Sequence, residues 1–321
     1  MKPASFRRGL HDMGNGLYAW LQPDGGWGWS NAALIVDGDQ SLLVDTLFDE
    51  PLTAQMLAAM QDATGIAPDA IPLLVNTHAN GDHTHGNALV PNAEIIASAA
   101  AAQEMAELPP ALVAKLMAGA AAGALGPAGG MLKEVFAPFD LASARGRPPT
   151  RTFAERLDLR VGDKAVELRK LGPAHTTGDT IVHVPGDRAI FTGDILFVDV
   201  TPIMWAGPVG SWLAACDWIL DLDVEHIVPG HGRPTDKAGV RRLQEYLRYV
   251  DHEARRRYEA GMPALEAAQD IALGEFRHWL DAERIAANVL ALYREYSGDS
   301  RPPDMIAVFN AMAVLRRAQR R

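Results

Sequence analysis

The twelve residues from 76 to 87 contain most of the side chains in this chain that are suited to metal chemistry. They read Asn-Thr-His-Ala-Asn-Gly-Asp-His-Thr-His-Gly-Asn, so three of the ten histidines lie within eight residues, with a carboxylate between them. The apolar run 71–75 comes directly before them, which predicts a buried strand that ends where the polar residues begin. Imidazole and carboxylate together suit Zn, Fe or Mn, and a loop at a strand end can turn several side chains toward one point. The segment therefore predicts a metal site.

Further candidate ligands follow at three separate places in the chain. His175 comes after the strand-like run 165–171, and Asp194 and His231 each end a short apolar segment. A Gly-rich turn lies at each of these places, where a strand gives way to a loop. This arrangement is expected when ligands from separate strands converge on one edge of a sheet.

The order of these motifs resembles that of the metallo-β-lactamase fold superfamily of metallohydrolases. A His-x-x-x-Asp-His motif begins at His78, and His-Thr-x-Gly, Gly-Asp and Pro-Gly-His motifs follow it in that order. The resemblance covers roughly residues 15–235. It implies an α/β fold, the four-layer αβ/βα sandwich, with the metal site between its two sheets. It also implies two ligand sets that share Asp194 as a bridge: His78, His175 and Asp194 at one metal, and Asp82, His83, Asp194 and His231 at the other.

The chain departs from the family pattern at Asn80, where a second histidine is usual. An amide oxygen is a neutral, hard donor and is weaker than imidazole. Three arrangements stay open. Asn80 ligates weakly and gives a first site of reduced affinity; or it does not ligate and leaves a two-histidine, one-carboxylate set; or His85 turns in as a ligand or acts on the substrate. A plainer interpretation of His85 is a hydrogen-bonded loop residue that supports the metal ligands.

The chemistry expected of such a centre assigns further roles. Asp82 and Asp194 would orient a metal-bound hydroxide, and His85 is the candidate group that contacts the substrate. Asp45 follows an apolar run and is expected to support the metal loop from behind. Three tryptophans near the motifs are candidates for an apolar substrate pocket, although packing against the sheet edge would explain the first two equally well: Trp27, Trp29 and Trp205.

Composition excludes several other classes of protein. Net charge is −10 over 321 residues, which argues against a nucleic-acid partner because phosphate binding needs a basic face. The single cysteine, Cys216, rules out an internal disulfide. The sequence has no uninterrupted apolar run long enough to span a membrane, and its start lacks the apolar stretch of a secretory signal. A cytoplasmic enzyme with a small-molecule substrate and no membrane partner is expected.

The chain divides into a catalytic domain at 1–235 and a helical C-terminal extension at 236–321 that is expected to pack on the same domain. Within the first part, the Ala- and Gly-rich segment of about 98–150 has apolar residues at helical spacing and a run at 123–130 that we expect to be flexible. We predict that this insertion is a helical lid; the alternative is a helix pair packed away from the site. The helices expected in the extension each have an apolar face, which predicts core contacts or a homodimer interface. The extension lacks the features of a flavodoxin or of an alkylsulfatase sterol-carrier-like domain, which disfavours those branches of the superfamily.

These observations favour a metal-dependent hydrolase that directs a metal-activated water at an ester, thioester, lactone or lactam with bulky apolar groups. One or two Zn ions are expected, with Fe or Mn as alternatives. Two other functions stay open. A mononuclear Fe(II) site at the first ligand set would suit dioxygen chemistry, and a metal that only templates the cyclisation of a polyketide would make the protein a cyclase or a non-hydrolytic binder.

Overall fold

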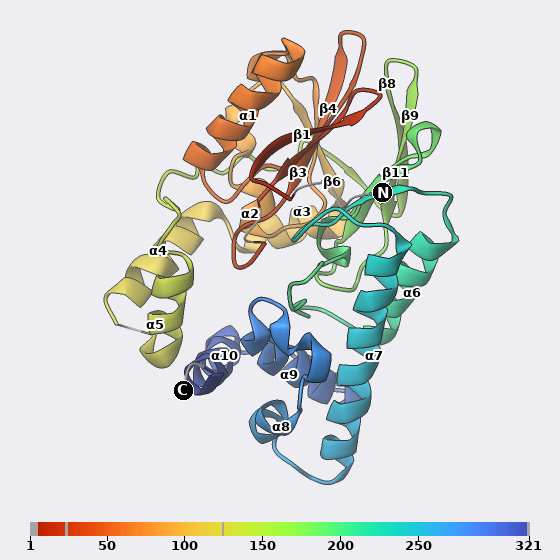
Figure 1. Cartoon of the computed structure of the whole chain (residues 1–321). Coiled ribbons are helices and arrows are strands. Elements are labelled where there is room, and N and C mark those ends of the chain that lie inside the picture. Colours follow the sequence, from red (N-terminus) through yellow and green to blue (C-terminus); the bar gives the residue numbers. More distant parts are fainter. Residues whose placement is uncertain (1–5, 23–24, 124, 320–321) are drawn as a thin grey trace.

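The computed structural model describes residues 6–22, 25–123 and 125–319. Two β-sheets lie face to face, and helices cover the outer face of each sheet (Figure 1). The first sheet has seven strands in sequence order, antiparallel up to β4 and parallel from there on. Its strands are β1 Gly9–Gly14, β2 Leu17–Leu21, β3 Ala32–Asp37, β4 Gln40–Val44, β5 Leu73–Val75, β6 Glu94–Ser98 and β7 Arg151–Phe153.

The second sheet has five strands in the order β12-β11-β10-β9-β8. They pair antiparallel except for β11 and β12, which are parallel and are connected through helix α6 (Val209–Asp221). Two parallel neighbours run in the same direction, so the chain has to return to the start of the sheet between them, which requires such a crossover. The strands are β8 Arg156–Val161, β9 Lys164–Lys170, β10 Thr180–Val184, β11 Ala189–Phe191 and β12 His226–Val228.

The alternation of side chains along the central strands explains why the sheets stack. In β3, Ala33 and Ile35 point into the core between the two sheets, while Leu34 faces the outer helices. The strand therefore reads as a continuous apolar run, as expected for a strand covered on both faces. The second sheet supplies Val182 and Phe191 to the same inter-sheet core.

Helix α1, Glu50–Thr64, covers the outer face of the first sheet. Asp49 caps its start by accepting a hydrogen bond from the backbone N of Leu52 at 2.7 Å, and Gly65 ends it in the left-handed conformation. Helices α6 and α7 (Lys237–Glu259) cover the second sheet, and Asp236 caps α7. The four layers of the predicted αβ/βα sandwich are therefore confirmed.

The insertion between β6 and β7 is helical, as predicted, but its Gly-rich run is not the flexible connection that we expected. Apart from residue 124, which lies outside the described residues, helix α5 (Gly126–Val135) takes up most of this run. The helix follows α3 (Ala99–Glu107) and α4 (Pro110–Ala121). It packs against the last helix, α10 (Met305–Gln319), where the backbone N of Ala128 donates to Asn310 Oδ1 at 2.9 Å (Figure 1). Gly129 lies against α4, where an added Cβ would lie 3.1 Å from the carbonyl oxygen of Ala120.

The C-terminal extension consists of α7, α8 (Ala264–Asp270), α9 (Ile285–Ser297) and α10. Its buried side chains, such as Val240 and Val289, belong to the same apolar cluster as Ile190 of the second sheet. The extension thus packs on the sandwich and, through α10, on the insertion. Among the described residues, no helix has both the length and the apolar character that a membrane span needs.

Candidate metal centre

Loops from both sheets deliver the predicted ligands to one edge of the sandwich. The chain leaves β5, passes His78, and forms the short helix α2 (Gly81–Thr84), which carries Asp82 and His83. His175 lies on the loop between β9 and β10. Asp194 lies in the 3₁₀ turn after β11, and His231 follows β12. Because these strand ends share one edge, residues as far apart in the sequence as His78 and His231 meet there.

The side chains form two groups in which the candidate ligand atoms lie within 4.8 Å of one another. His78, His175 and Asp194 form the first group, and Asp82, His83 and His231 form the second. Asp194 lies between them, as a bridging carboxylate would. Its carboxylate oxygens lie 3.7 Å from His78 Nε2, 3.3 Å from His175 Nε2, 3.2 Å from His83 Nε2 and 3.4 Å from His231 Nε2, and Asp82 Oδ2 lies 3.3 Å from His231 Nε2.

Each of the four imidazoles is held by its other ring nitrogen. His175 Nδ1 faces the carbonyl oxygen of Ile203 at 2.6 Å, and His231 Nδ1 faces that of Gly25 at 3.0 Å. A carbonyl can only accept, so Nδ1 carries the proton and Nε2 presents its lone pair to the centre when the ring is neutral. Metal-binding histidines are usually oriented in this way.

Asp45 holds the remaining two rings. Its Oδ2 lies 2.9 Å from His83 Nδ1 and accepts from Thr77 Oγ1 at 2.7 Å, and Thr77 Oγ1 lies 3.0 Å from His78 Nδ1. Because the Thr77 hydroxyl gives its proton to Asp45, it accepts the proton of His78. One buried carboxylate therefore sets the orientation of a histidine in each group, which is the supporting position proposed from the sequence.

The centre contains polar atoms that the described protein does not satisfy. Nε2 of His78, Nε2 of His83 and Oδ1 of Asp194 are buried and have no hydrogen-bond partner among the described residues. Leaving such atoms unpaired away from water costs free energy, about 1–3 kcal/mol for each neutral group. A cation in each group, with Asp194 between them, would satisfy these three atoms. The donor set, imidazole with carboxylate, therefore fits a divalent transition metal.

Electrostatics differ between the two groups. Burial lowers the pKa of His78 and of His175, so both rings are neutral at pH 7. Burial also disfavours the charged form of His231, but Asp194 and Asp82 outweigh it and raise the pKa of His231 to about 9. The pKa of His83 is raised for the same reason by Asp194 and Asp45. Without a cation, the second group therefore carries protons where the first does not.

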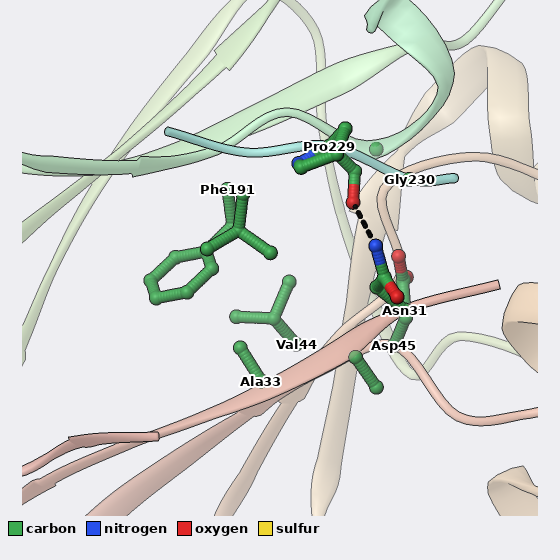
Figure 2. A pocket seen from close by; sticks show the side chains of 10 residues that line it. Asn31, Ala33, Val44, Asp45, Phe191, Pro229 and Gly230 are labelled. Atoms are coloured by element: carbon green, nitrogen blue, oxygen red, sulfur yellow. Dashed lines mark hydrogen bonds between the residues drawn. The ribbon is translucent and has the colours of Figure 1, made fainter. Parts of the chain in front are cut away.

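The floor of the centre is closed by the approach of the two sheets. Asn31 Nδ2 donates to the carbonyl oxygen of Pro229 at 3.0 Å (Figure 2) and to that of Gly232 at 2.8 Å, which fixes the loop of His231. A small cavity of about 10 Å³, the lower limit for one water molecule, lies beside this contact, and Figure 2 shows side chains that line it. Any side chain at Gly230 would collide with Asp194, because an added Cβ would lie 2.0 Å from Oδ1.

Asn80 and His85 flank the two ends of α2. The amide nitrogen of Asn80 lies 3.0 Å from His175 Nε2. His85 is buried and stacks on Phe48 with ring centroids 5.5 Å apart, and its Nδ1 lies 3.2 Å from the carbonyl oxygen of Phe48. Its Nε2 faces the backbone at Gly81, where an added Cβ would lie 2.4 Å away.

Two of the three predicted pocket tryptophans come together, and the third does not join them. Trp27 and Trp205 both contact Phe309 of α10, with ring centroids 6.1 Å and 5.8 Å away. Trp29 faces Phe139 on the side of the first sheet, with centroids 4.7 Å apart. Trp27 also meets Phe136 of the insertion edge to face.

We define the aromatic wall as Trp27, Phe136, Trp205 and Phe309. It lies beside the metal centre because the backbone of Trp205 donates to the carbonyl of His175, at 2.9 Å, and Gly25 of the Trp27 loop accepts from His231. Sequence reasoning missed Phe136 and Phe309 as members of this wall. It also missed Asn31 and the carbonyl partners of the histidines. None of these positions carries a local sequence signal that points to the centre.

This chain belongs to the metallo-β-lactamase superfamily. The family's sequence model matches residues 25–231, which include every candidate ligand. A metallo-β-lactamase from Pontibacter korlensis has a similar structure, with a TM-score of 0.57 at 15% sequence identity; the match covers 75% of this chain and 99% of that one. At this identity the likeness shows the fold alone.

A second structural likeness extends beyond the catalytic domain. A stereoselective inverting sec-alkylsulfatase from Pseudomonas sp. matches with a TM-score of 0.66 at 16% identity, over 93% of this chain and 52% of that one. The C-terminal extension makes up more than a quarter of this chain, so most of it must have a counterpart in that fold. At this identity the likeness shows the fold alone.

A relative found by sequence is named neither as a β-lactamase nor as an alkylsulfatase. The 2,4-dinitroanisole O-demethylase subunit alpha from Nocardioides sp. (strain JS1661) is 28% identical over 145 residues, which is 43% of this chain and 38% of that protein. The chain thus matches well under half the length of that relative.

The position of Asp45 generates a first prediction. Replacing Asp45 with Asn places an NH₂ group against donors at His83 and Thr77, so the orientation of His83 is lost. We expect the metal affinity to fall by about 10–100-fold, as is typical when a residue that orients a ligand is removed. Chelator competition measures this, with the exposed Asp39→Asn as a control that leaves the affinity unchanged. An unaltered affinity in Asp45→Asn would show that the carboxylate does not orient the ligands.

A second prediction follows from the raised pKa of His231. Below about pH 9 the metal-free protein holds a proton on this ring, and a metal can bind only after that proton leaves. We expect metal uptake at pH 7.5 to release at least one proton and the apparent affinity to rise with pH toward 9. Calorimetric titration in buffers of different ionisation enthalpy counts these protons; uptake without proton release contradicts the assignment.

The raised pKa of His231 opposes metal binding, but it stabilises the metal-free fold. The folded-state pKa of His231 lies above the ordinary value of 6.5, so the charged ring stabilises the metal-free protein fully below pH 6.5. This contribution is lost as pH rises through 9. Thermal unfolding of the metal-free protein across this range therefore provides an independent check of the sign.

Proposed function

We propose that this protein is a metal-dependent hydrolase that directs an activated water at a carbonyl carbon of a bulky apolar substrate, an ester, thioester, lactone or lactam. The observation that carries the proposal is the set of buried, unsatisfied Nε2 and carboxylate atoms around Asp194. A divalent metal held there lowers the pKa of a bound water to about 7 and polarises the carbonyl oxygen. Zinc is the proposed metal, as one or two ions, with iron or manganese as alternatives.

The carboxylates of the centre orient the attacking water. Asp194 has both oxygens directed at the four imidazoles, so it is committed to the ligand set. Asp82 is half-buried, with its Oδ2 at His231, and lies at the open side of the centre on α2. The Asp82 carboxylate is therefore the group that can accept a hydrogen bond from the water. This contact would keep a lone pair of the water turned toward the substrate.

His85 is the candidate for direct contact with the substrate. Burial lowers the pKa of His85, so its ring is neutral at pH 7. With Nδ1–H donated to the carbonyl of Phe48, Nε2 is an acceptor that faces the turn between Asn80 and Asp82. The ring can therefore accept a hydrogen bond from a substrate group bound over α2, while the stacked Phe48 keeps it in place.

The aromatic wall supports an apolar or aromatic substrate. Its rings come from three segments far apart in the sequence, and they lie next to the loops of His175 and His231. The nearest cation, Arg284, is buried with its guanidinium 4.2 Å from the Trp27 ring centroid and donates to the carbonyl of Thr201. It is therefore engaged within the protein, which leaves little provision for a strongly anionic ligand.

A second candidate function is the hydrolytic cleavage of an aryl methyl ether. The relative named as a 2,4-dinitroanisole O-demethylase favours it, together with the aromatic wall. The reaction balances with water alone: the water oxygen adds to the electron-poor ring carbon, the bond from that carbon to the methoxy oxygen breaks, and methoxide leaves with the proton to give a phenol and methanol. The mononuclear Fe(II) alternative is less favoured, because the second ligand group is assembled as fully as the first.

The test compares metal-loaded and chelator-treated protein on a panel of substrates. The panel holds aryl esters of increasing acyl size, a thioester, a lactone, a lactam and 2,4-dinitroanisole. We expect turnover of the bulkier acyl substrates that is lost after chelation, restored by Zn²⁺ and absent in His83→Ala, whereas the exposed His252→Ala keeps it. Turnover that survives chelation, or none across the panel, would refute the hydrolase, and turnover of 2,4-dinitroanisole alone would select the second candidate.

A further prediction separates the role of His85 from that of a ligand. In His85→Ala we expect kcat to fall by about 10²–10⁴-fold with metal content unchanged, because a hydrogen-bond acceptor for the substrate is lost. His85→Gln restores part of the rate, since its amide oxygen can accept. Metal content measured beside the rate decides the outcome: loss of metal in proportion to activity would place His85 among the ligands instead.

A further inference from the structure

Asn80 occupies a helix-capping position but does not cap the helix. It lies at the N-cap of α2 with extended backbone angles, φ −65° and ψ 145°, and asparagine is among the best residues at such a position. Its side chain nevertheless accepts no capping hydrogen bond from the described residues. The amide is turned into the metal centre, with its nitrogen 3.0 Å from His175 Nε2. The sequence thus forgoes a local stabilising contact in order to place an amide among the ligands.

We propose that Asn80 is the fourth donor of the first ligand group, through Oδ1, and that it makes this group the weaker and more exchangeable of two unequal metal sites. This inference rests on the metal centre of the proposed function and extends it to the order in which the two sites fill.

The distances match those between donors on one ion. Two donors bound about 2.1 Å from the same metal are ~3.0–3.4 Å apart at angles between square and tetrahedral. The Asn80 amide lies 3.0 Å from His175 Nε2, and that nitrogen lies 3.3 Å from Asp194 Oδ2. His78 Nε2 lies 3.7 Å from Asp194 Oδ2, slightly beyond this range. The Asn80 amide thus stands where the missing fourth donor of this group belongs.

The identity of the amide atom follows from the state of His175. Its Nδ1 is bonded to the carbonyl of Ile203, so its Nε2 carries a lone pair, which the Asn80 NH₂ group faces in the metal-free protein. A cation on that lone pair would repel the NH₂ group. A half-turn of the amide exchanges nitrogen for oxygen in the same space, so Oδ1 replaces it without a change in the backbone.

The competing donor is held away from this position. His85 was the other residue that could have completed the first group. Its Nδ1 lies at the carbonyl of Phe48, its ring stacks on Phe48, and its Nε2 lies against Gly81. No His85 atom belongs to either group of candidate ligands among the described residues.

The two donor sets differ in charge. Besides the shared Asp194, the second group has the carboxylate of Asp82 and two imidazoles. The first group has two imidazoles and a neutral amide oxygen, which is the weaker donor. Metal should therefore fill the Asp82 group first, and the ion beside Asn80 should exchange more readily.

The experiment is a titration of the metal-free protein with Co²⁺, followed by its visible absorption and by competition with chelators of graded affinity. The wild-type protein should bind two ions in separate steps, with dissociation constants at least ~10-fold apart. Asn80→Ala should weaken the second step by a further ~10-fold or more, and Asn80→His should strengthen it by a similar factor. In all variants the first step should stay within about threefold of wild type, which also shows that the protein is folded.

The matched control is Asn92→Ala, an exposed asparagine whose amide donates to the carbonyl of Asp69 far from the centre. It should change neither step. Two equal steps in the wild-type protein, an unaltered second step in Asn80→Ala, or no strengthening in Asn80→His would overturn the proposal. An equal loss of both steps in Asn80→Ala would also do so, because it would show a general role in shaping α2. No substrate is used, so these outcomes are independent of whether the proposed hydrolysis occurs.

Discussion

The confinement of one carboxylate, Asp194, among four imidazoles is the constraint on which the rest of this structure depends. These groups are buried, and several of their polar atoms have no hydrogen-bond partner in the part of the chain that the structure describes. Such an arrangement is costly unless a cation occupies it, and it collapses unless each ring is held by contacts from outside the centre. The surrounding fold supplies those contacts from many separate segments. This is why residues so distant in sequence have to be fixed relative to one another.

The need to hold the histidines from outside the centre also involves the Trp27 loop, the insertion and the extension. The Trp27 loop orients His231 through Gly25 and is tied to the extension where Trp27 Nε1 donates to Glu283 at 3.0 Å. Glu283 is buried and is paired with Arg316, which also reaches Glu134 of the insertion. A buried carboxylate is tolerated only when it is paired in this way. The Trp27 loop, the insertion and the extension are therefore joined by one connected network of contacts.

Much of the fold was predictable where the signals were local. The apolar runs at 71–75 and 165–171 marked β5 and β9, because backbone and neighbouring side chains decide such elements. The spacing of ligands around His78 was predictive for the same reason. By contrast, the Gly-rich run at 123–130 was misjudged, because packing against α10 decides its conformation.

The parts of the site that sequence did not reveal are those made by contacts between distant segments. A backbone carbonyl such as that of Ile203 has no sequence signature as the partner of His175, and Phe309 reads only as a core residue of its helix. The possible homodimer and the nature of the substrate stay predictions for the same reason: both depend on surfaces that no short motif specifies.

The chemistry of the centre and the choice of substrate are set by different parts of the chain. Structures that share this fold carry names as different as β-lactamase and alkylsulfatase, so the ligand set alone does not define the reaction. In this protein the rings beside the centre come from the Trp27 loop, the insertion and α10. Metal binding depends on Asp45 and the strand-end loops, while the contacts among the Trp27 loop, the insertion and the extension depend on Glu283 and Arg316. The two sets meet where Gly25 accepts from His231 and where the backbone of Trp205 donates to the carbonyl of His175, so a change in the wall would reach the metal ligands through these backbone contacts.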